Sequence, residues 1–377
     1  MKKILFVFGT RPEAIKLAPV IAEFRTPSRE GGTAFASHVA VTGQHRGLLD
    51  QALDVFSIVP DFDLNVMRAG QTLYDSTSRI MAALEPVLRT ERPDLVIVQG
   101  DTTTAFCGAL AAFYAGVPVG HVEAGLRTGD LREPFPEEMN RVLVAKLAAL
   151  HFAPTEAAAE NLRLEGVRPA SIFVTGNTGV DAVLGVRDRL EKGTLRAEGL
   201  PVLDAAKKLV LVTAHRRESF GGGFDGICAA LARLAVRGDV EIVYPVHPNP
   251  NVREVVECRL AGVAGIHLVE PLAYVPFVEL MRRSHILLTD SGGIQEEGPS
   301  LGKPVLVMRD KTERPEAVAA GTAVLVGTDP ARIVRETARL LDDAGEYSRR
   351  SRIHNPYGDG RASAGIRDAV ACYFATS

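Results

Sequence analysis

Three acidic residues follow predicted strands of the N-terminal half at positions suited to proton transfer. Asp101 and Glu123 come shortly after predicted strands at 94–98 and 117–121, and Glu137 begins the next helix. Because the carboxyl ends of parallel strands meet at one edge of a sheet, we expect the three carboxylates to converge. Crowded carboxylates raise one another's pKa, which suits one to act as an acid while another acts as a base. Each acid could equally serve only to cap its own helix.

A second candidate site lies in the C-terminal half, where the predicted strand 286–289 turns into a helix through Ser291, Gly292 and Gly293. The first N–H groups of a helix lack carbonyl partners and lie at the positive end of the helix dipole, and glycines let a phosphate come close. Glu296 follows about one turn later, where a carboxylate could accept hydrogen bonds from a ribose. The pattern favours a nucleotide diphosphate, although a plain strand-to-helix connection would use the same residues.

Two cations lie near the start of the first predicted helix. Arg11 follows the first strand, 4–8, and Lys16 comes later on the same helix, which opens with a Thr10–Glu13 capping box. This is the edge at which open α/β sheets bind ligands, so both cations are candidates for an anionic substrate. The alternative is that they are ordinary surface cations.

Histidines follow two strands of the second half. His215 comes after the predicted strand 209–213, and His247 after the strand 240–244. A histidine at the carboxyl end of a strand can contact a ligand, whereas a purely structural role remains an equal alternative for His215.

The length and the strand pattern predict two domains. A chain of 377 residues exceeds the size at which a single core usually stops growing. Strands and helices alternate in both halves, which predicts an α/β fold of two doubly wound, Rossmann-like domains facing a cleft. We expect the domains to span residues 1–177 and 178–360, with a final helix at 361–377 that packs back on the first domain.

Charge and composition exclude several classes of protein. A net charge of −3 argues against nucleic acid or an anionic membrane as the main partner. The 4 cysteines are scattered without close pairs, so no disulfide framework and no zinc site is indicated. No apolar run of about 18 residues occurs, so we expect no membrane span and a cytoplasmic protein.

Six segments together resemble one family. The chain is similar in all of them, in the same order and over nearly its whole length, to the non-hydrolysing UDP-N-acetylglucosamine 2-epimerases. The segments are GTRPEAIKLAP, QGDTTT, HVEAGLRTGD, PFPEEMNR, HRRES and DSGGIQEEGPSLGKPVLVMRDKTERPEA.

The resemblance implies a fold of the glycosyltransferase-B type with a UDP-sugar between the domains, and interconversion of UDP-GlcNAc and UDP-ManNAc. It also implies elimination of UDP to 2-acetamidoglucal followed by re-addition, a homodimer, no metal or nicotinamide cofactor, and a supply of ManNAc-derived sugars for surface polysaccharide.

The resemblance also assigns roles to individual residues. A second UDP-GlcNAc is implied as an allosteric effector, although Gly70 precedes Gln71 where some relatives carry arginine. The implied catalytic residues are Asp101, Glu123, Glu137 and His215; the substrate-binding residues are Arg11, Lys16, Phe277, Ser291, Gly292, Gly293, Glu296 and Arg314; the effector residues are Gln44, Gln71, Arg216 and His247.

Three other functions share parts of this pattern. A glycosyltransferase would have the fold and the nucleotide turn but less use for three clustered acids. A hydrolysing epimerase would release free ManNAc, and a nucleotide-sugar sensor would bind without turnover. The sequence leaves open which carboxylate is the base and which is the acid.

Overall fold

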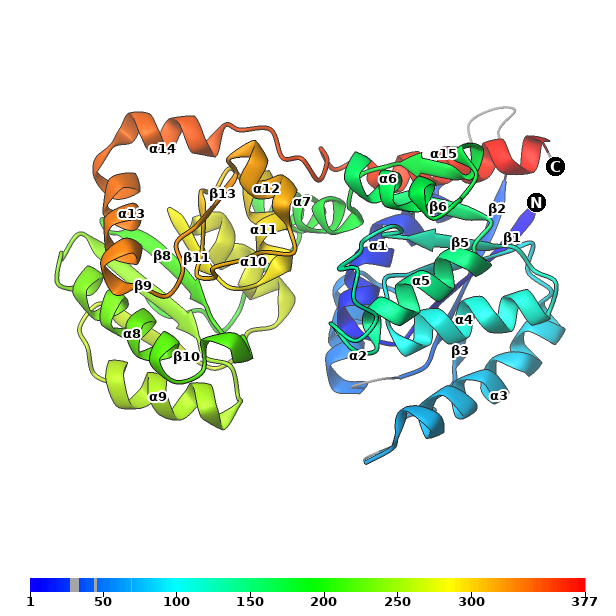
Figure 1. Cartoon of the computed structure of the whole chain (residues 1–377), viewed down its shortest axis with the longest axis horizontal. Coiled ribbons are helices and arrows are strands. Elements are labelled where there is room, and N and C mark those ends of the chain that lie inside the picture. The colour runs from blue at the N-terminus through cyan, green and yellow to red at the C-terminus, as the bar shows by residue number, and fades with distance from the viewer. Residues whose placement is uncertain (28–33, 44–45, 69, 377) are drawn as a thin grey trace. The chain divides into compact units, whose positions relative to one another are not determined.

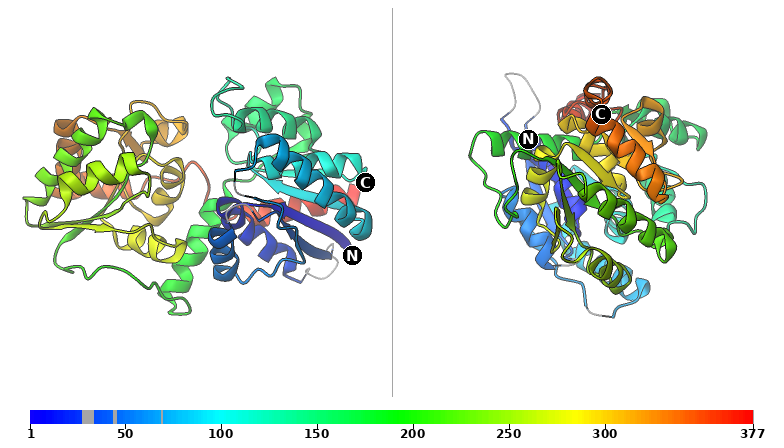
Figure 2. Two further views of the ribbon diagram at one scale, coloured as in Figure 1. Left: turned by 90° about the horizontal axis from the view of Figure 1, so that it is seen from below. Right: turned by 90° about the vertical axis from the view of Figure 1, so that its left-hand side faces the viewer.

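The computed structural model describes residues 1–27, 34–43, 46–68 and 70–376. The chain divides into two compact units, the first comprising Met1–Ala182 with Tyr357–Ser377 and the second Val183–Pro356. In each unit, helices cover both faces of a parallel sheet (Figure 1, Figure 2). The predicted α/β class with two doubly wound halves is confirmed.

The sheet of the first unit has the strand order β3-β2-β1-β4-β5-β6-β7, and its order reverses between β1 and β4. The two-residue β3 was not predicted, because a segment this short has no alternation to recognise. The strands are β1 (Lys2–Phe8), β2 (Phe35–Val41), β3 (Phe62–Asp63), β4 (Leu95–Gln99), β5 (Val119–Val122), β6 (Leu150–Ala153) and β7 (Ile172–Val174). The helices are α1 (Arg11–Arg25), α2 (Arg46–Val55), α3 (Leu73–Glu91), α4 (Thr103–Tyr114), α5 (Glu137–Leu147), α6 (Glu156–Leu164) and α15 (Ala362–Thr376). Helix α7 (Thr178–Glu191) begins in the first unit and continues into the second.

Strand β1 lies in the interior of the first unit's sheet, and its apolar composition accounts for this position. It pairs with both β2 and β4, and its residues Ile4–Phe8 are at most 1% exposed. A strand covered on both faces reads as a continuous apolar run, as this one does.

The final helix α15 packs against α1, and the Phe374 ring lies 6.5 Å from that of Phe35.

The sheet of the second unit has the order β10-β9-β8-β11-β12-β13, with its reversal between β8 and β11. Its core is built largely from the apolar faces of β8, β9, β11, α8 and α9. The strands are β8 (Lys208–Thr213), β9 (Val240–Pro245), β10 (Ile266–Val269), β11 (Ile286–Thr289), β12 (Val305–Val307) and β13 (Ala323–Leu325). The helices are α8 (Gly222–Ala235), α9 (Pro250–Leu260), α10 (Tyr274–Arg283), α11 (Gly292–Glu297), α12 (Pro315–Ala320), α13 (Pro330–Asp342) and α14 (Ala344–Ser351).

Each reversal in strand order opens a crevice at the carboxyl ends of the neighbouring strands, the place where doubly wound sheets bind ligands. Asp101, Glu123, His215 and Ser291 are among the predicted residues that lie just beyond strand ends, those of β4, β5, β8 and β11. Among the helices of the described residues, none combines the length and the apolar character needed to cross a membrane.

Candidate functional site

A cavity of about 470 Å³ lies at the carboxyl ends of β4 and β5 in the first unit. The three acids that the sequence predicted to converge all line it. The lining residues are Thr10, Pro12, Glu13, Lys16, Leu73, Gln99, Gly100, Asp101, Thr102, Thr103, Glu123, Pro136, Glu137 and Asn140. We call this space the acid cavity.

Glu123 is held in the acid cavity by its backbone and by two donors. Its φ of +67° lies in the left-handed region, which a residue with a side chain rarely adopts. Lys16 Nζ lies 2.5 Å from its Oε2, and Gln99 Nε2 donates to the same oxygen at 2.6 Å. Strained backbone of this kind concentrates at functional sites, because the surrounding structure must fix it there.

Asp101 is fixed from helix α5. Arg141 Nε and Nη2 lie 2.8 Å and 2.7 Å from its Oδ2, and Asn140 Nδ2 donates to its backbone carbonyl at 2.8 Å. Arg141 Nη1 also binds Glu138 at 3.0 Å, and Glu138 is only 1% exposed. The pair of contacts from one guanidinium sets the direction of the Asp101 carboxylate.

Glu137 is the first residue of α5 and reaches the acid cavity from a different element than the other two acids. Glu13 adds a fourth carboxyl to the lining, where burial raises its pKa to about 7 in spite of the hydrogen bonds it accepts from Thr10, Thr102 and Gly9. The sequence indicated Glu13 only as half of a capping box. The box itself is confirmed, with Oε2 accepting the Thr10 N–H at 2.8 Å.

The second unit places the glycine turn beside a cation. Ser291 is the N-cap residue of α11, and Gly292 and Gly293 are its first residues. The Arg314 guanidinium lies within about 3.8–3.9 Å of where a side chain on Gly292 would begin. Its Nε also forms an ion pair with Glu296, which is 2% exposed. Backbone N–H groups and a guanidinium thus face one small space, an arrangement suited to a phosphate.

His215 is positioned by a buried carboxylate. Asp290, which is 0% exposed, accepts the backbone N–H groups of His215 and Arg216 at 2.6 Å and 2.7 Å, and its Oδ1 lies 3.1 Å from His215 Nδ1. Burial works to raise the pKa of Asp290, but the bond and charge of His215 and the two N–H groups outweigh it and lower that pKa. The His247 ring stacks on His215 at 5.4 Å, and burial followed by the charge of His215 lowers its pKa.

The structure does not bring every predicted residue into these groups. Arg11 begins α1 but is not among the residues that line the acid cavity, and Phe277 is half-buried on α10. Gln71 belongs to the first unit, whereas Arg216 and His247 belong to the second. Gln44 lies outside the described residues.

Several site residues were missed by the sequence reasoning. Arg141, Asn140, Gln99 and Asp290 were not singled out from the sequence. Arg141 lies four residues after Glu137, the helical spacing at which two side chains share a face, and this signal could have found it. In the part of the chain that the structure describes, no group of three His, Cys, Asp or Glu side chains could hold a metal ion.

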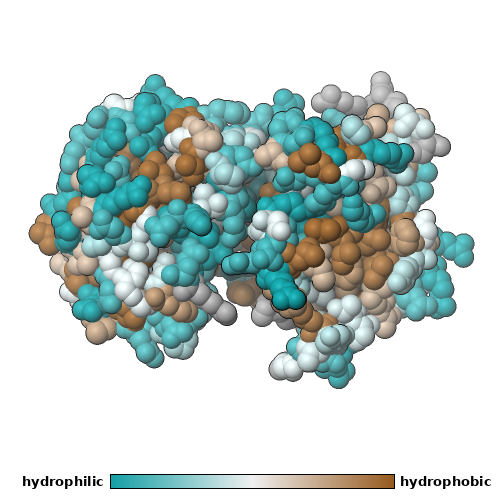
Figure 3. Space-filling view, in the orientation of Figure 1, coloured by the Kyte–Doolittle hydropathy of each residue, from teal (hydrophilic) through white to brown (hydrophobic). Residues whose placement is uncertain are grey.

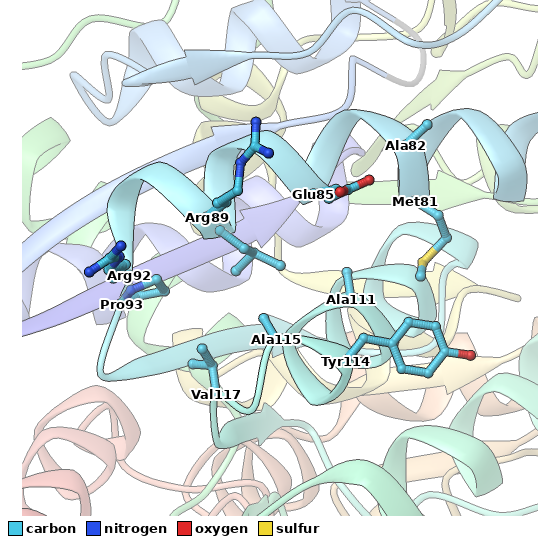
Figure 4. Close-up of a pocket in the computed structure, with 11 residues that line it drawn as sticks. Met81, Ala82, Glu85, Arg89, Arg92, Pro93, Ala111, Tyr114, Ala115 and Val117 are labelled. Carbon is cyan, nitrogen blue, oxygen red and sulfur yellow. The ribbon is translucent and has the colours of Figure 1, made fainter.

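A larger cavity of about 790 Å³ lies between α3 and α4, away from the predicted residues. Figure 4 shows Met81 of α3 and Tyr114 of α4 at the same end of it. Its lining is mainly apolar, with Glu85, Arg89 and Arg92 as the charged members. This composition favours packing or binding over acid–base chemistry.

Comparison with known proteins points to one family. Residues 29–371 match the family model described as UDP-N-acetylglucosamine 2-epimerase. The chain is 57% identical over 374 residues to the UDP-N-acetylglucosamine 2-epimerase of Escherichia coli O157:H7, covering 98% of each chain. It is 57% identical over 376 residues to that of Salmonella typhimurium, covering 98% of this chain and 99% of the relative. The crystal structure of UDP-GlcNAc 2-epimerase from Neisseria meningitidis bound to UDP-GlcNAc is similar with a TM-score of 0.87 and 47% identity, covering 98% of this chain and 99% of that one.

Proposed function

The chain belongs to the UDP-N-acetylglucosamine 2-epimerase family, and from this premise we propose that it interconverts UDP-GlcNAc and UDP-ManNAc by inverting C2 of the sugar. The observation that carries the proposal is the convergence of Asp101, Glu123 and Glu137 on one cavity. Inversion at carbon needs a base on one face and an acid on the other, and a set of carboxylates supplies both.

The proposed reaction runs through elimination and re-addition. A carboxylate removes the C2 proton while the bond from C1 to the UDP oxygen breaks, and a C1–C2 double bond forms in 2-acetamidoglucal. The UDP oxygen then returns to C1 as a second group delivers a proton to the opposite face of C2. Neither elimination nor re-addition transfers a hydride, so this route uses no nicotinamide. Which acid takes which part is left open among Asp101, Glu123 and Glu137.

The departing diphosphate needs positive charge and hydrogen-bond donors, and the second unit offers them. We assign this part to the Ser291–Gly293 turn, Arg314 and His215, with Arg11 and Lys16 as further cations from the first unit. The position of the Arg314 guanidinium next to the open space beside Gly292 supports this assignment of the diphosphate to the second unit. Glu296 and Phe277 are assigned to the ribose and the uracil on the family resemblance.

The biological role that we propose is a cytoplasmic supply of ManNAc-derived sugars for surface polysaccharide. The direct test is incubation of purified protein with UDP-GlcNAc alone, followed by chromatographic separation of the nucleotide sugars. We expect an equilibrium mixture with UDP-ManNAc. Free ManNAc with UDP would indicate a hydrolysing epimerase, and unchanged substrate would favour a glycosyltransferase or a sensor.

We propose, on the resemblance, that a second UDP-GlcNAc activates the enzyme through Gln71, Arg216 and His247, with Gln44. The stacking of His247 on His215 supports a link between effector and catalytic groups, because a ligand that moves one ring must disturb the other. With UDP-ManNAc as the only substrate, we expect a lag or a sigmoidal rate curve that added UDP-GlcNAc removes. Hyperbolic kinetics without UDP-GlcNAc would contradict this.

We further propose that two copies associate through the outer face of α4 and α5. Helix α4 contains no charged residue, yet Phe113 and Tyr114 on it are 58% and 72% exposed. Figure 3 shows a hydrophobic patch over these helices. A helix this apolar is expected to be covered. Charges of both signs, Glu85 and Arg89, line the neighbouring cavity, so a two-fold related copy can place acid against base.

The association is tested by light scattering during size-exclusion chromatography. We expect the wild type to have the mass of two chains and Tyr114→Lys to shift toward one chain, because the new ammonium would be desolvated. Val236→Lys is the matched control, since Val236 is 85% exposed on the second unit. A monomeric wild type would contradict the proposal.

A further inference from the structure

Glu13 lines the acid cavity but has no part in the chemistry proposed above. Its side chain is buried, with 1% exposed. Oε2 accepts the N–H groups of Gly9 and Thr10 at 3.1 Å and 2.8 Å, and Oε1 accepts the hydroxyl of Thr102 at 2.7 Å. A capping box requires only the bond to the N-cap N–H. Capping of α1 therefore does not account for the hydrogen bond between Glu13 and Thr102.

Thr102 connects this carboxylate to the start of a second helix. It is the N-cap residue of α4, and its Oγ1 accepts the N–H of Ala105 at 3.0 Å while its own proton goes to Glu13. Asp101 is the residue immediately before it. The position of the Thr102 hydroxyl therefore helps to set the backbone from which the Asp101 carboxylate projects.

Glu13 is also joined to a second acid through its own helix. Lys16 lies three residues later on α1, and its Nζ lies 2.5 Å from Glu123 Oε2. A rigid helical turn thus separates the group that holds Glu123 from the group that holds the start of α4. Helix α1 therefore links the position of Glu123, which follows β5, to that of Asp101, which follows β4.

Burying the ionised carboxylate of Glu13 lowers the stability of the folded protein. Burial raises the pKa of Glu13 from 4.5 to about 7, although its hydrogen bonds act in the opposite direction. The folded protein therefore holds the proton more tightly than the unfolded chain, and the stability that depends on this group falls as the pH rises from 4.5 to about 7. A neutral amide would avoid this cost.

Resting on the proposed function, we propose that Glu13 is a positioning residue for epimerisation: its carboxylate ties the start of α1 to the start of α4 and so fixes Asp101 relative to the Lys16–Glu123 pair. It exchanges no proton with the sugar. The titratable and charged groups that share the cavity with it are Lys16 on its own helix, Asp101 after β4, Glu123 after β5 and Glu137 on α5.

The test is Glu13→Gln, which keeps the size of the side chain but turns a donor toward the Thr102 hydroxyl. We expect kcat to fall about tenfold or more, because small displacements of reacting groups cost rate steeply, while KM for UDP-GlcNAc changes less than about threefold. The wild-type kcat should rise with pH near 7, and the variant should lose that dependence. A kcat within about twofold of wild type with the same pH profile would overturn the proposal.

A double-mutant cycle with Thr102→Val sharpens the result. If both residues act through their shared bond, the double variant should be no slower than the slower single variant, whereas additive losses would contradict a shared role. Asp75→Asn is the matched control, because Asp75 closes an exposed capping box with Thr72 at the start of α3. It should lower the thermal midpoint and leave kcat unchanged.

The wild-type rate in the same assay separates the two proposals. A wild type without turnover would refute the proposed function. A wild type that turns over, with Glu13→Gln equal to it, would refute only the positioning role.

Discussion

The two units of this molecule share one strand order around their reversal point but place opposite chemistry there. In the first unit, the ends of β4 and β5 lead to carboxylates, with Asp101 and Glu123 lining one cavity. In the second, the ends of β11 and β12 lead to a glycine turn and to Arg314. The fold provides the same crevice twice, and the residues at the strand ends decide its chemistry: we propose proton transfer in the first unit and anion binding in the second.

The two sites also differ in how they are held. The acids of the first unit are held by cations and amides, such as Arg141 on Asp101. In the second unit the roles are reversed, because buried acids hold the nitrogen-bearing side chains: Asp290 contacts His215, and Glu296 contacts Arg314. Changes in the first unit should therefore affect turnover most, and changes in the second should affect nucleotide affinity or stability.

The largest effect is expected from Glu123→Gln and Glu137→Gln. Each removes a group proposed for proton transfer and leaves the second unit untouched, so kcat should fall at least about a hundredfold while UDP still binds. Steady-state rates and calorimetric titration with UDP measure the two properties separately. Unchanged turnover in either variant would refute the assignment of that residue to proton transfer. Loss of UDP binding would contradict the claim that nucleotide affinity depends mainly on the second unit.

A smaller effect, on affinity, is expected from Gly292→Ala. The new methyl group would enter the space between the turn and Arg314, where it meets no atom closer than 3.8 Å, so the fold should tolerate it. A phosphate would be kept away from the backbone N–H groups, and Kd for UDP should rise about tenfold. Gly185→Ala on α7 is the control, because a side chain there meets nothing within 4 Å. Equal UDP affinity in the two variants would argue against the turn as the diphosphate site.

Asp290→Asn is expected to have the smallest effect on turnover. Its main effect should be a loss of stability. The native carboxylate accepts two N–H groups and contacts His215, so its loss should lower the free energy of unfolding by about 2 kcal/mol at neutral pH. Because the folded pKa of Asp290 lies below its ordinary 3.8, the stability it contributes is present above 3.8 and is lost as the pH falls through the folded pKa. Denaturant unfolding of both proteins should therefore converge in acid. A constant difference at all pH values would contradict this account of Asp290.

Much of the fold could be predicted because strand ends carry local signals. The strand at 286–289 and the helix beginning at Glu137 coincide with β11 and the start of α5. Apolar runs that end in glycine or acidic residues mark such boundaries without reference to the rest of the chain. The short β3 lacks such a run and was missed.

The candidate site was predicted less completely, because its contacts join distant parts of the chain. That Asp101 and Glu123 line one cavity follows from parallel strand order, which the alternating pattern implies. The spacing from Glu137 could point to Arg141, but its contact with Asp101, like that of Glu13 with Thr102, depends on side-chain directions that no spacing rule fixes. The left-handed backbone of Glu123 likewise has no signal in the sequence, since glycine is the residue expected there.

The central claim, that the acid cavity breaks and remakes a C–H bond, is tested most directly by proton NMR of UDP-GlcNAc with the purified protein in D2O. With no metal, nicotinamide or acceptor added, we predict that the C2 proton signal disappears as UDP-ManNAc forms, because each return passes through an intermediate that has lost this proton. UDP-ManNAc that retains the C2 proton in full, or no change of the substrate in the presence of folded protein, would contradict the account.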